Sequence, residues 1–168
     1  IAEKHEMHLH LLEIIEWEKK LVFVESIRMG KEKGSFRDLI MKEKEIVGRH
    51  LNTMEYQLLD FTVLQTSSKR GGVMLRSERD REAYKAMAAD PLLENENAPL
   101  SYQARFLFHR IRSILATATH NDFQTSYGET KELIRLMRNN EWQVSENPSL
   151  YLAACAEACF NARQLKKY

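Results

Sequence analysis

The chain has few of the residues that break helices or cross-link small folds. Its 168 residues include only 6 glycines, 3 prolines and 2 cysteines. Scarce glycine and proline favour long helices joined by few turns, and a chain of this length buries enough surface to need no disulfide. Every apolar run is short and interrupted by charge, so we expect no transmembrane span. These absences predict an all-α globular fold.

The chain also lacks an excess of charge of either sign. It has 25 basic and 24 acidic residues, a formal net charge of +1 and an apolar fraction of 43%. This balance argues against an extended polyanion or a membrane surface as the partner. The length suggests one domain, 1–168. Because the first residue is Ile1 and not Met, we expect the chain to be a piece of a longer protein.

Two amphipathic helices with a short break between them predict a helical hairpin. The first, from Ser101 to Thr119, has an apolar stripe at helical spacing: Leu107, Ile111, Ile114, Leu115 and Ala118. The break is 120–122, and the second helix starts at Phe123. Such a short break forces the helices to be antiparallel.

Residues 139–147 read as a loop, with Trp142 and Val144 as anchors into the core. Pro148 then starts a last, alanine-rich helix, because proline is favoured at the first helical position. Cys155 and Cys159 lie four positions apart on this helix. We expect both to be small, buried, free thiols, because a disulfide at that spacing is strained and no zinc-ligand pattern accompanies them. Free thiols fit a reducing compartment, and we expect a cytoplasmic protein.

The N-terminal part predicts a long helical hairpin, 1–68, from helices over 3–29 and 36–68. The second helix has a nearly heptad stripe that includes Leu51, Met54, Leu58 and Phe61, so a coiled-coil dimer is one interpretation. Apolar residues off that stripe, Leu59 and Val63, favour packing within the chain instead. Gly48 inside this helix suggests a close helix contact or a bend.

The middle of the chain contains its clearest break, Arg70-Gly71-Gly72. Ser35 to Asp38 and Ser77 to Asp80 have the form of capping boxes. The second of these starts a short helix, 78–89, which Pro91 ends. Residues 92–98 read as a linker. Together with the hairpins, these elements predict six helices and no strand.

Several segments resemble a known helical-repeat family. The quoted segments are Tyr102-Gln103-Ala104-Arg105-Phe106, Asn121-Asp122-Phe123-Gln124-Thr125-Ser126-Tyr127, Glu132-Leu133-Ile134-Arg135-Leu136, Glu146-Asn147-Pro148-Ser149-Leu150-Tyr151 and Leu165-Lys166-Lys167-Tyr168. They resemble tetratricopeptide-repeat-like (TPR-like) proteins of Bacteroidetes bacteria, and the spacing of similar turns suggests a period of about 45 residues. The resemblance implies a TPR-like αα-superhelix, a solenoid of antiparallel helix hairpins, with degenerate repeats over 76–168. It also implies protein binding, and it brings no catalytic residue.

A partner-binding face is predicted on the helix from Ser101 to Thr119. Arg105, His109 and Arg112 share one face, about 100° or more from the apolar stripe. If this face lines the concave side, it favours an acidic peptide, because arginine holds carboxylates with paired hydrogen bonds. The alternative is that the three side chains form only a solvated face.

Other candidate sites are weaker. His5 and His8 invite a metal site but do not have the HExxH spacing, so a solvated helix end is the preferred interpretation. The basic residues around Arg70 and Arg79 could bind an anion, but without interleaved aromatics we do not expect nucleic acid. The chain shows no nucleophile elbow, glycine-rich phosphate loop or metal-ligand cluster. We therefore expect no enzyme activity, no catalytic residue, no metal site and no cofactor.

The sequence thus predicts a non-catalytic scaffold or adaptor that binds a protein or peptide. The alternative is a ligand- or peptide-sensing regulatory domain attached to an effector, for example a DNA-binding domain, elsewhere in a longer protein. The sequence leaves the partner's identity and the oligomeric state open.

Overall fold

The computed structural model describes residues 7–29, 35–69 and 78–166. In this part of the chain the elements are all helical: α1 (His8–Met29), α2 (Ser35–Lys69), α3 (Glu78–Ala88), the 3-10 turn η1 (Pro91–Leu93), α4 (Tyr102–His120), α5 (Phe123–Arg138), α6 (Glu141–Glu146) and α7 (Pro148–Gln164). The predicted all-α fold is confirmed for the described residues, which contain no strand.

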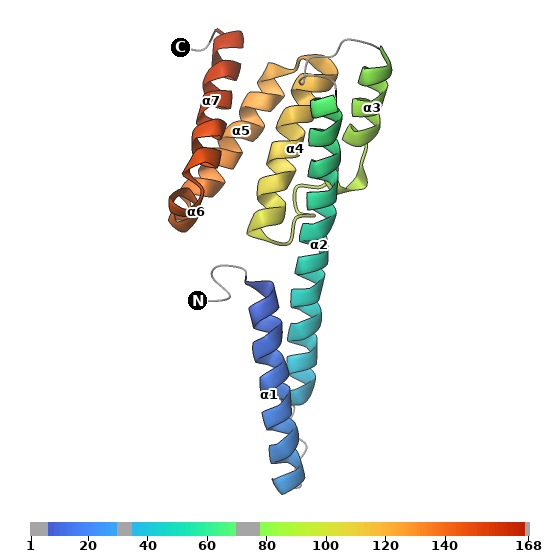
Figure 1. The fold of residues 1–168 in the computed structure, drawn as a ribbon, viewed down its shortest axis with the longest axis vertical. Helices are drawn as coiled ribbons and strands as arrows, with labels where there is room; N and C mark the ends of the chain where they lie inside the picture. Colours follow the sequence, from blue (N-terminus) through green and yellow to red (C-terminus); the bar gives the residue numbers. More distant parts are fainter. Residues whose placement is uncertain (1–6, 30–34, 70–77, 167–168) are drawn as a thin grey trace.

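The molecule has two parts, which Figure 1 shows one above the other. The arm consists of α1 and residues 35–55 of α2, which run antiparallel beside each other and project from the rest. The body consists of the second half of α2 with α3, α4, α5, α6 and α7. In the body α4 packs on α2 and α3, α5 packs on α4, and α7 packs on α5. The long helix α2 therefore belongs to both parts.

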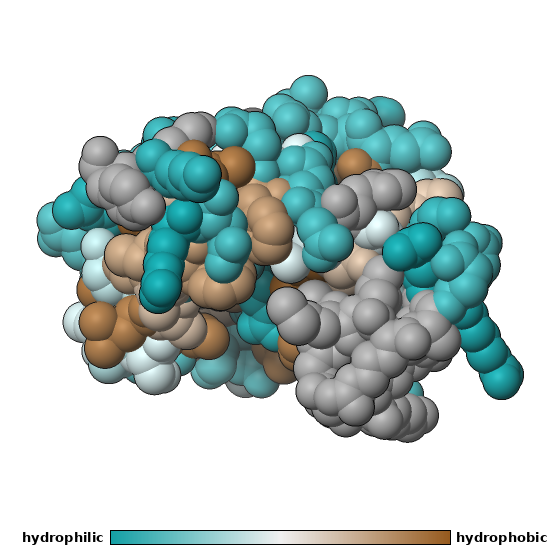
Figure 2. Space-filling model, turned by 90° about the horizontal axis from the view of Figure 1, so that it is seen from above, coloured by the Kyte–Doolittle hydropathy of each residue, from teal (hydrophilic) through white to brown (hydrophobic). Residues whose placement is uncertain are grey.

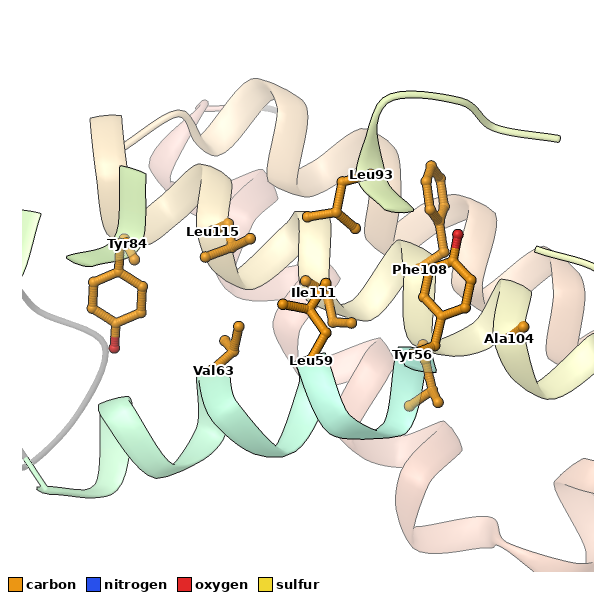
Figure 3. Close-up of a cluster of buried hydrophobic side chains, with 11 residues drawn as sticks. Tyr56, Leu59, Val63, Tyr84, Leu93, Ala104, Phe108, Ile111 and Leu115 are labelled. Carbon is orange, nitrogen blue, oxygen red and sulfur yellow. The ribbon is translucent and has the colours of Figure 1, made fainter. Parts of the chain in front are cut away.

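The core of the body lies between α2, α3 and α4 (Figure 3). Phe108 and Ile111 from α4 are fully buried and meet Tyr56 and Val63 from α2. The ring centroids of Tyr56 and Phe108 are 6.3 Å apart in an edge-to-face arrangement, which is favourable for aromatic pairs. The Tyr56 hydroxyl donates to the Leu92 carbonyl at 2.7 Å, which fixes η1 on the core. Of the α4 residues predicted to pack into the core, Leu107, Ile111 and Ala118 are buried, and Ile114 packs against the same core but is only partly buried.

Short polar residues determine where α4 and α5 begin and end. The Ser101 hydroxyl accepts from the Ala104 amide and caps the N-terminus of α4. Asn121, with a φ of 51°, ends α4 in the left-handed conformation that asparagine tolerates. The Asp122 side chain then accepts from the Thr125 amide and starts α5. Two residues between the helices make the predicted hairpin, and α4 and α5 pack along their length.

The arm buries much less of its apolar surface. Ile15 from α1 and Ile46 from α2 are its buried aliphatic side chains. Beside them, Lys19 donates to both carboxylate oxygens of Glu43 at 3.0 and 3.1 Å. The exposed apolar side chains of α1 lie on several sides of the helix: Leu9, Ile14, Trp17, Leu21, Phe23, Val24 and Ile27.

Some details differ from the sequence predictions. Residues 141–146 form α6 where a loop was predicted, so the described residues contain seven α-helices and not six. Cys159 is exposed and Cys155 is half-buried, so the prediction of two buried thiols is wrong. The reason is that α7 meets the body through the side that carries Ala154 and Asn161, whereas Cys159 lies on another side of the helix. The capping residue Ser77 and the Gly71-Gly72 break lie outside the described residues.

At the end of the body farthest from the arm, hydrophobic and hydrophilic side chains occupy different parts of the surface (Figure 2). Figure 2 looks onto this end, and hydrophobic side chains gather over α5 and α7, on the left of the view. Hydrophilic side chains cover much of the remaining surface in this view.

Candidate functional site

The structure brings two of the three predicted partner-binding residues together around one carboxylate. Glu129 of α5 is nearly buried, and its Oε1 lies 2.8 Å from Arg112 Nε while its Oε2 lies 2.7 Å from His109 Nδ1. The Arg112 guanidinium also lies 5.0 Å from the centre of the Phe108 ring. His109 and Arg112 therefore join α4 to α5, and a residue of the same chain occupies the position where we expected an acidic peptide.

Arg105 differs from its two neighbours. Its side chain is exposed, and its Nε lies 3.5 Å from the Pro99 carbonyl oxygen. It lines a cleft of about 560 Å³ together with His109, Glu129, Glu132 and Arg135. Because Arg135 already pairs with Glu132 and Glu129 pairs with His109, the cleft has both signs of charge and no concentrated positive surface. Sequence reasoning missed Glu129, which no motif distinguishes from the other acidic residues of the helix.

A stronger candidate surface lies on α2. Five large apolar side chains, spaced alternately four and three residues apart, are between 39% and 69% exposed. We call them the α2 stripe: Val47, Leu51, Met54, Leu58 and Phe61. Because this spacing keeps every member on one side of a helix, the stripe is a continuous apolar surface. It runs from the arm onto the body.

The structure distinguishes the two apolar sides of this helix. Leu59 and Val63 pack within the chain, as the sequence favoured, but with Tyr56 they are buried against α4 and not against α1. The heptad-like stripe faces outward. Helix α2 has two apolar sides, and the sequence pattern detected both without showing which one the body covers.

A groove borders the α2 stripe at Leu58. It has a volume of about 610 Å³ and lies between α2 and the segment from α3 to η1. Apolar side chains, including Leu58, Met87 and Leu92, line it, and Glu55 and Asp90 are its two acidic residues. An apolar floor with acidic groups beside it suits a partner that is apolar on one side and basic on the other.

Two titratable groups near this surface have shifted pKa values for structural reasons. Burial raises the pKa of Asp60 on α2, although Arg110, whose Nη2 lies 2.8 Å from its Oδ2, opposes that shift. Burial also raises the pKa of Tyr56 to about 12. Asp60 joins α2 to α4 and Tyr56 joins α2 to η1, so both groups hold the body together and neither points into the groove.

The described residues place few other chemical groups together. No set of three or more His, Cys, Asp or Glu side chains in 7–29, 35–69 and 78–166 is arranged to hold a metal ion. No helix in the same residues is long and apolar enough to cross a membrane. His5, half of the histidine pair considered above, lies outside the described residues, and His8 is buried beside His50 with ring centroids 5.8 Å apart.

No protein-family model, no curated protein and no solved structure matches the chain. The surfaces described above are therefore the features that bear on the function of this chain.

Proposed function

We propose that the chain is a non-catalytic, TPR-like protein-binding scaffold that takes an amphipathic helix of another protein along the α2 stripe. The observation that carries this proposal is the exposure of the five stripe residues. Burying apolar surface against a partner lowers the free energy of the complex by about 25 cal/mol per Å². Folded monomers rarely expose continuous apolar patches larger than a few hundred Å² unless the patch is an interaction site.

The spacing of the stripe indicates what kind of partner fits. Alternating four- and three-residue steps form the seam of helix-to-helix packing, in which each side chain inserts between residues of the facing helix. A partner helix along α2 would reach the adjacent groove, where Glu55 and Asp90 favour basic side chains at its flank. The proposed partner is therefore a helix with one apolar and one basic side.

The order of packing supports the scaffold part of the proposal. Helices α2, α4, α5 and α7 lie beside one another in chain order (Figure 1), as successive helices do in a helical solenoid. The resemblance to TPR-like proteins of Bacteroidetes agrees with this order. The cytoplasmic location and the bacterial origin remain predictions. The free thiols of Cys155 and Cys159 are consistent with a reducing compartment such as the cytoplasm.

A photo-cross-linking experiment tests the α2 stripe. Leu58 is replaced by the photoreactive residue p-benzoylphenylalanine, and the same replacement at the exposed Arg138 of α5 is the matched control. In the native cell we expect covalent capture of a second protein from position 58 and not from position 138. The cross-linked residue of that protein should lie in a helix with an apolar and a basic side.

A reconstituted pair then measures the contribution of the stripe. Replacing Leu51 and Leu58 together by Gln should weaken binding of the captured protein at least about tenfold, because two buried apolar contacts are lost. Replacing Arg138, an exposed residue of α5, by Ala is the control and should leave binding unchanged. Capture of equal amounts from both positions, or cross-links only to another copy of this chain, would contradict the proposal.

The alternative function, a ligand- or peptide-sensing regulatory domain, also has an observation in its favour. A third cavity lies in the body, its lining contains no residue of the α2 stripe, and Glu157 is the single ionisable side chain in that lining.

A further inference from the structure

The third cavity, whose single ionisable side chain is Glu157, opens between α4, α5 and α7. It has a volume of about 340 Å³, and its lining comes from the C-terminal half of α4, the start of α5 and the second half of α7: Ile114, Thr117, Asn121, Phe123, Glu157, Phe160 and Asn161. These segments meet at the end of the body seen in Figure 2, where hydrophobic side chains gather over α5 and α7. The volume is at the lower end of small-ligand sites, so the cavity suits a small molecule or one side chain.

Glu157 is the one ionisable residue of the lining. Its Oε1 accepts a hydrogen bond from the Ser113 hydroxyl at 2.5 Å. Among the described residues no lysine, arginine or histidine forms an ion pair with it, whereas Glu129 and Glu132 of α5 are both paired. A carboxylate in a mainly apolar cavity attracts a cation more strongly than one in bulk water, because the local dielectric constant is lower.

A buried chain of hydrogen bonds holds the Glu157 carboxylate in place. Asn161 Nδ2 donates to Ser126 Oγ at 2.8 Å, and Ser126 Oγ lies 2.8 Å from Ser113 Oγ. Because the amide nitrogen can only donate, Ser126 is free to donate onward to Ser113, and Ser113 to Glu157. The side chains of Ser113, Ser126 and Asn161 are each at most 1% exposed. The carboxylate is therefore oriented before any ligand arrives, which lowers the entropy cost of binding.

Two aromatic rings form a wall of the same cavity. The rings of Phe123 and Phe160 lie edge to face, with centroids 6.1 Å apart and an interplanar angle of 69°. Aromatic faces attract cations, and they also pack well against methylene groups. Ile114 adds an aliphatic surface. The cavity thus combines one fixed negative charge with apolar walls.

We propose that this cavity binds a single positive charge on an apolar stem, as an alkylammonium or alkylguanidinium group, with Glu157 as its counter-ion. The stem lies against Phe123 and Phe160, and the charged head meets the carboxylate that Ser113 holds. Such a group can come from a lysine or arginine side chain of a peptide or from a free amine. Binding here does not depend on a partner at the α2 stripe, because none of the stripe residues lines this cavity.

A pair of probes of equal length tests the role of charge. Protein NMR titrations with n-butylammonium and with n-butanol are followed through the methyl groups of Ile114 and the rings of Phe123 and Phe160. We expect n-butylammonium to shift these resonances and to bind at least about tenfold more tightly than n-butanol, because a charge-assisted hydrogen bond is added.

Matched variants separate the charge from the fold. Glu157→Gln keeps an oxygen that can accept from Ser113, so the hydrogen-bond chain remains while the charge is lost. This variant should lose the preference for n-butylammonium, whereas Glu146→Gln, an exposed residue of α6, should keep it. Phe160→Leu should weaken the binding of both n-butylammonium and n-butanol, because it removes aromatic contact with the stem and leaves the charge of Glu157 in place.

The source of the cation is resolved by one more titration. Tighter binding of Nα-acetyl-lysinamide than of n-butylammonium supports a peptide side chain, and weaker binding supports a free amine. The proposal is overturned if n-butylammonium shifts none of these resonances, if it binds no better than n-butanol, or if Glu157→Gln retains the preference.

Discussion

The arm and the body are both rich in large apolar side chains, but they bury them very differently. In the body, Phe108, Ile111 and Leu115 of α4 are at most 3% exposed. In the arm, Trp17, Leu21 and Ile27 of α1 are at least 65% exposed. The difference follows from the number of neighbours, because α4 contacts α2, α3 and α5, whereas α1 packs mainly on α2.

This contrast shows that apolar sequence does not by itself create a core. A helix with apolar residues on all sides is normally buried on all sides, and α1 has such a sequence with only the side towards α2 covered. Its exposed apolar residues contribute little to the stability of this chain. They are available for contacts with another molecule, as is the α2 stripe, which continues from the arm onto the body.

The largest expected effect compares one aromatic residue from each part. Phe108→Ala in the body should lower the free energy of unfolding by about 3–5 kcal/mol, because it leaves a cavity in the core. Trp17→Ala in the arm should change it by no more than about 0.5 kcal/mol, because the side chain is 67% exposed. Urea denaturation of both variants measures the difference. Similar losses would show that the arm is packed as tightly as the body.

The next prediction concerns how independently the arm opens. Ile15 is 1% exposed and is the central apolar contact of α1. Ile15→Ala should cost about 2–5 kcal/mol of local stability, so the arm should open while the body stays folded. Native-state hydrogen exchange should become faster in α1 and remain unchanged in α4. Equal acceleration in both helices would mean that arm and body unfold as one unit.

The two parts should also respond to pH in opposite directions. In the body, burial raises the pKa of Asp60, so the native state binds more protons than the unfolded state between the two pKa values. Stability from this group therefore falls as pH rises through that interval. In the arm, the hydrogen bond from Lys19 lowers the pKa of Glu16. The contribution of Glu16 to folding stability is therefore present at neutral pH and is lost as pH falls.

Carboxyl-carbon NMR titration of the protein measures both groups. The Asp60 midpoint should lie above the ordinary value for aspartate, and the Glu16 midpoint below that for glutamate. Asp60→Asn should gain stability relative to the wild type as pH rises, since it removes the carboxylate that must ionise in a buried position. A stability difference that is independent of pH would refute the raised pKa.

The smallest effect concerns the glycines within two helices. A Cβ atom built at Gly48 in the arm, or at Gly128 in the body, meets no heavy atom within 4 Å. The close contact suggested for Gly48 by the sequence is therefore absent. Replacing either glycine by Ala should stabilise the protein by about 0.5–1 kcal/mol, because alanine loses less backbone entropy in a helix. Thermal unfolding that shows a loss at Gly48 alone would indicate a covered surface in the arm.

Several elements followed from local chemistry and could be predicted. Proline at 148 and the polar residues around Asn121 and Asp122 mark helix ends because their side chains and backbone preferences act within a few residues. The apolar stripe of α4 was assigned correctly because that helix has one dominant apolar side. Helix α6 was missed because its six residues have no side-chain cap at Asn140 and no apolar period long enough to detect.

The candidate sites were harder to predict, because each depends on residues far apart in the chain. Arg112 looked available in the sequence, but Glu129 from the next helix neutralises it. Glu157 had no distinguishing motif, and its setting arises from Ser113, Ser126 and Asn161 on three different helices. A side chain's partner across a helix interface cannot be read from periodicity.

The sequence by itself determined the class of fold and most helix ends, since helical periodicity and capping are local and act through neighbours three and four residues away. Only the tertiary structure decided which apolar side of α2 is buried. The body covers Tyr56, Leu59 and Val63 and leaves Leu51, Leu58 and Phe61 exposed. Both sides carry enough apolar surface to be buried, so the choice depended on where α4 and α3 pack, which is a property of the assembled helices.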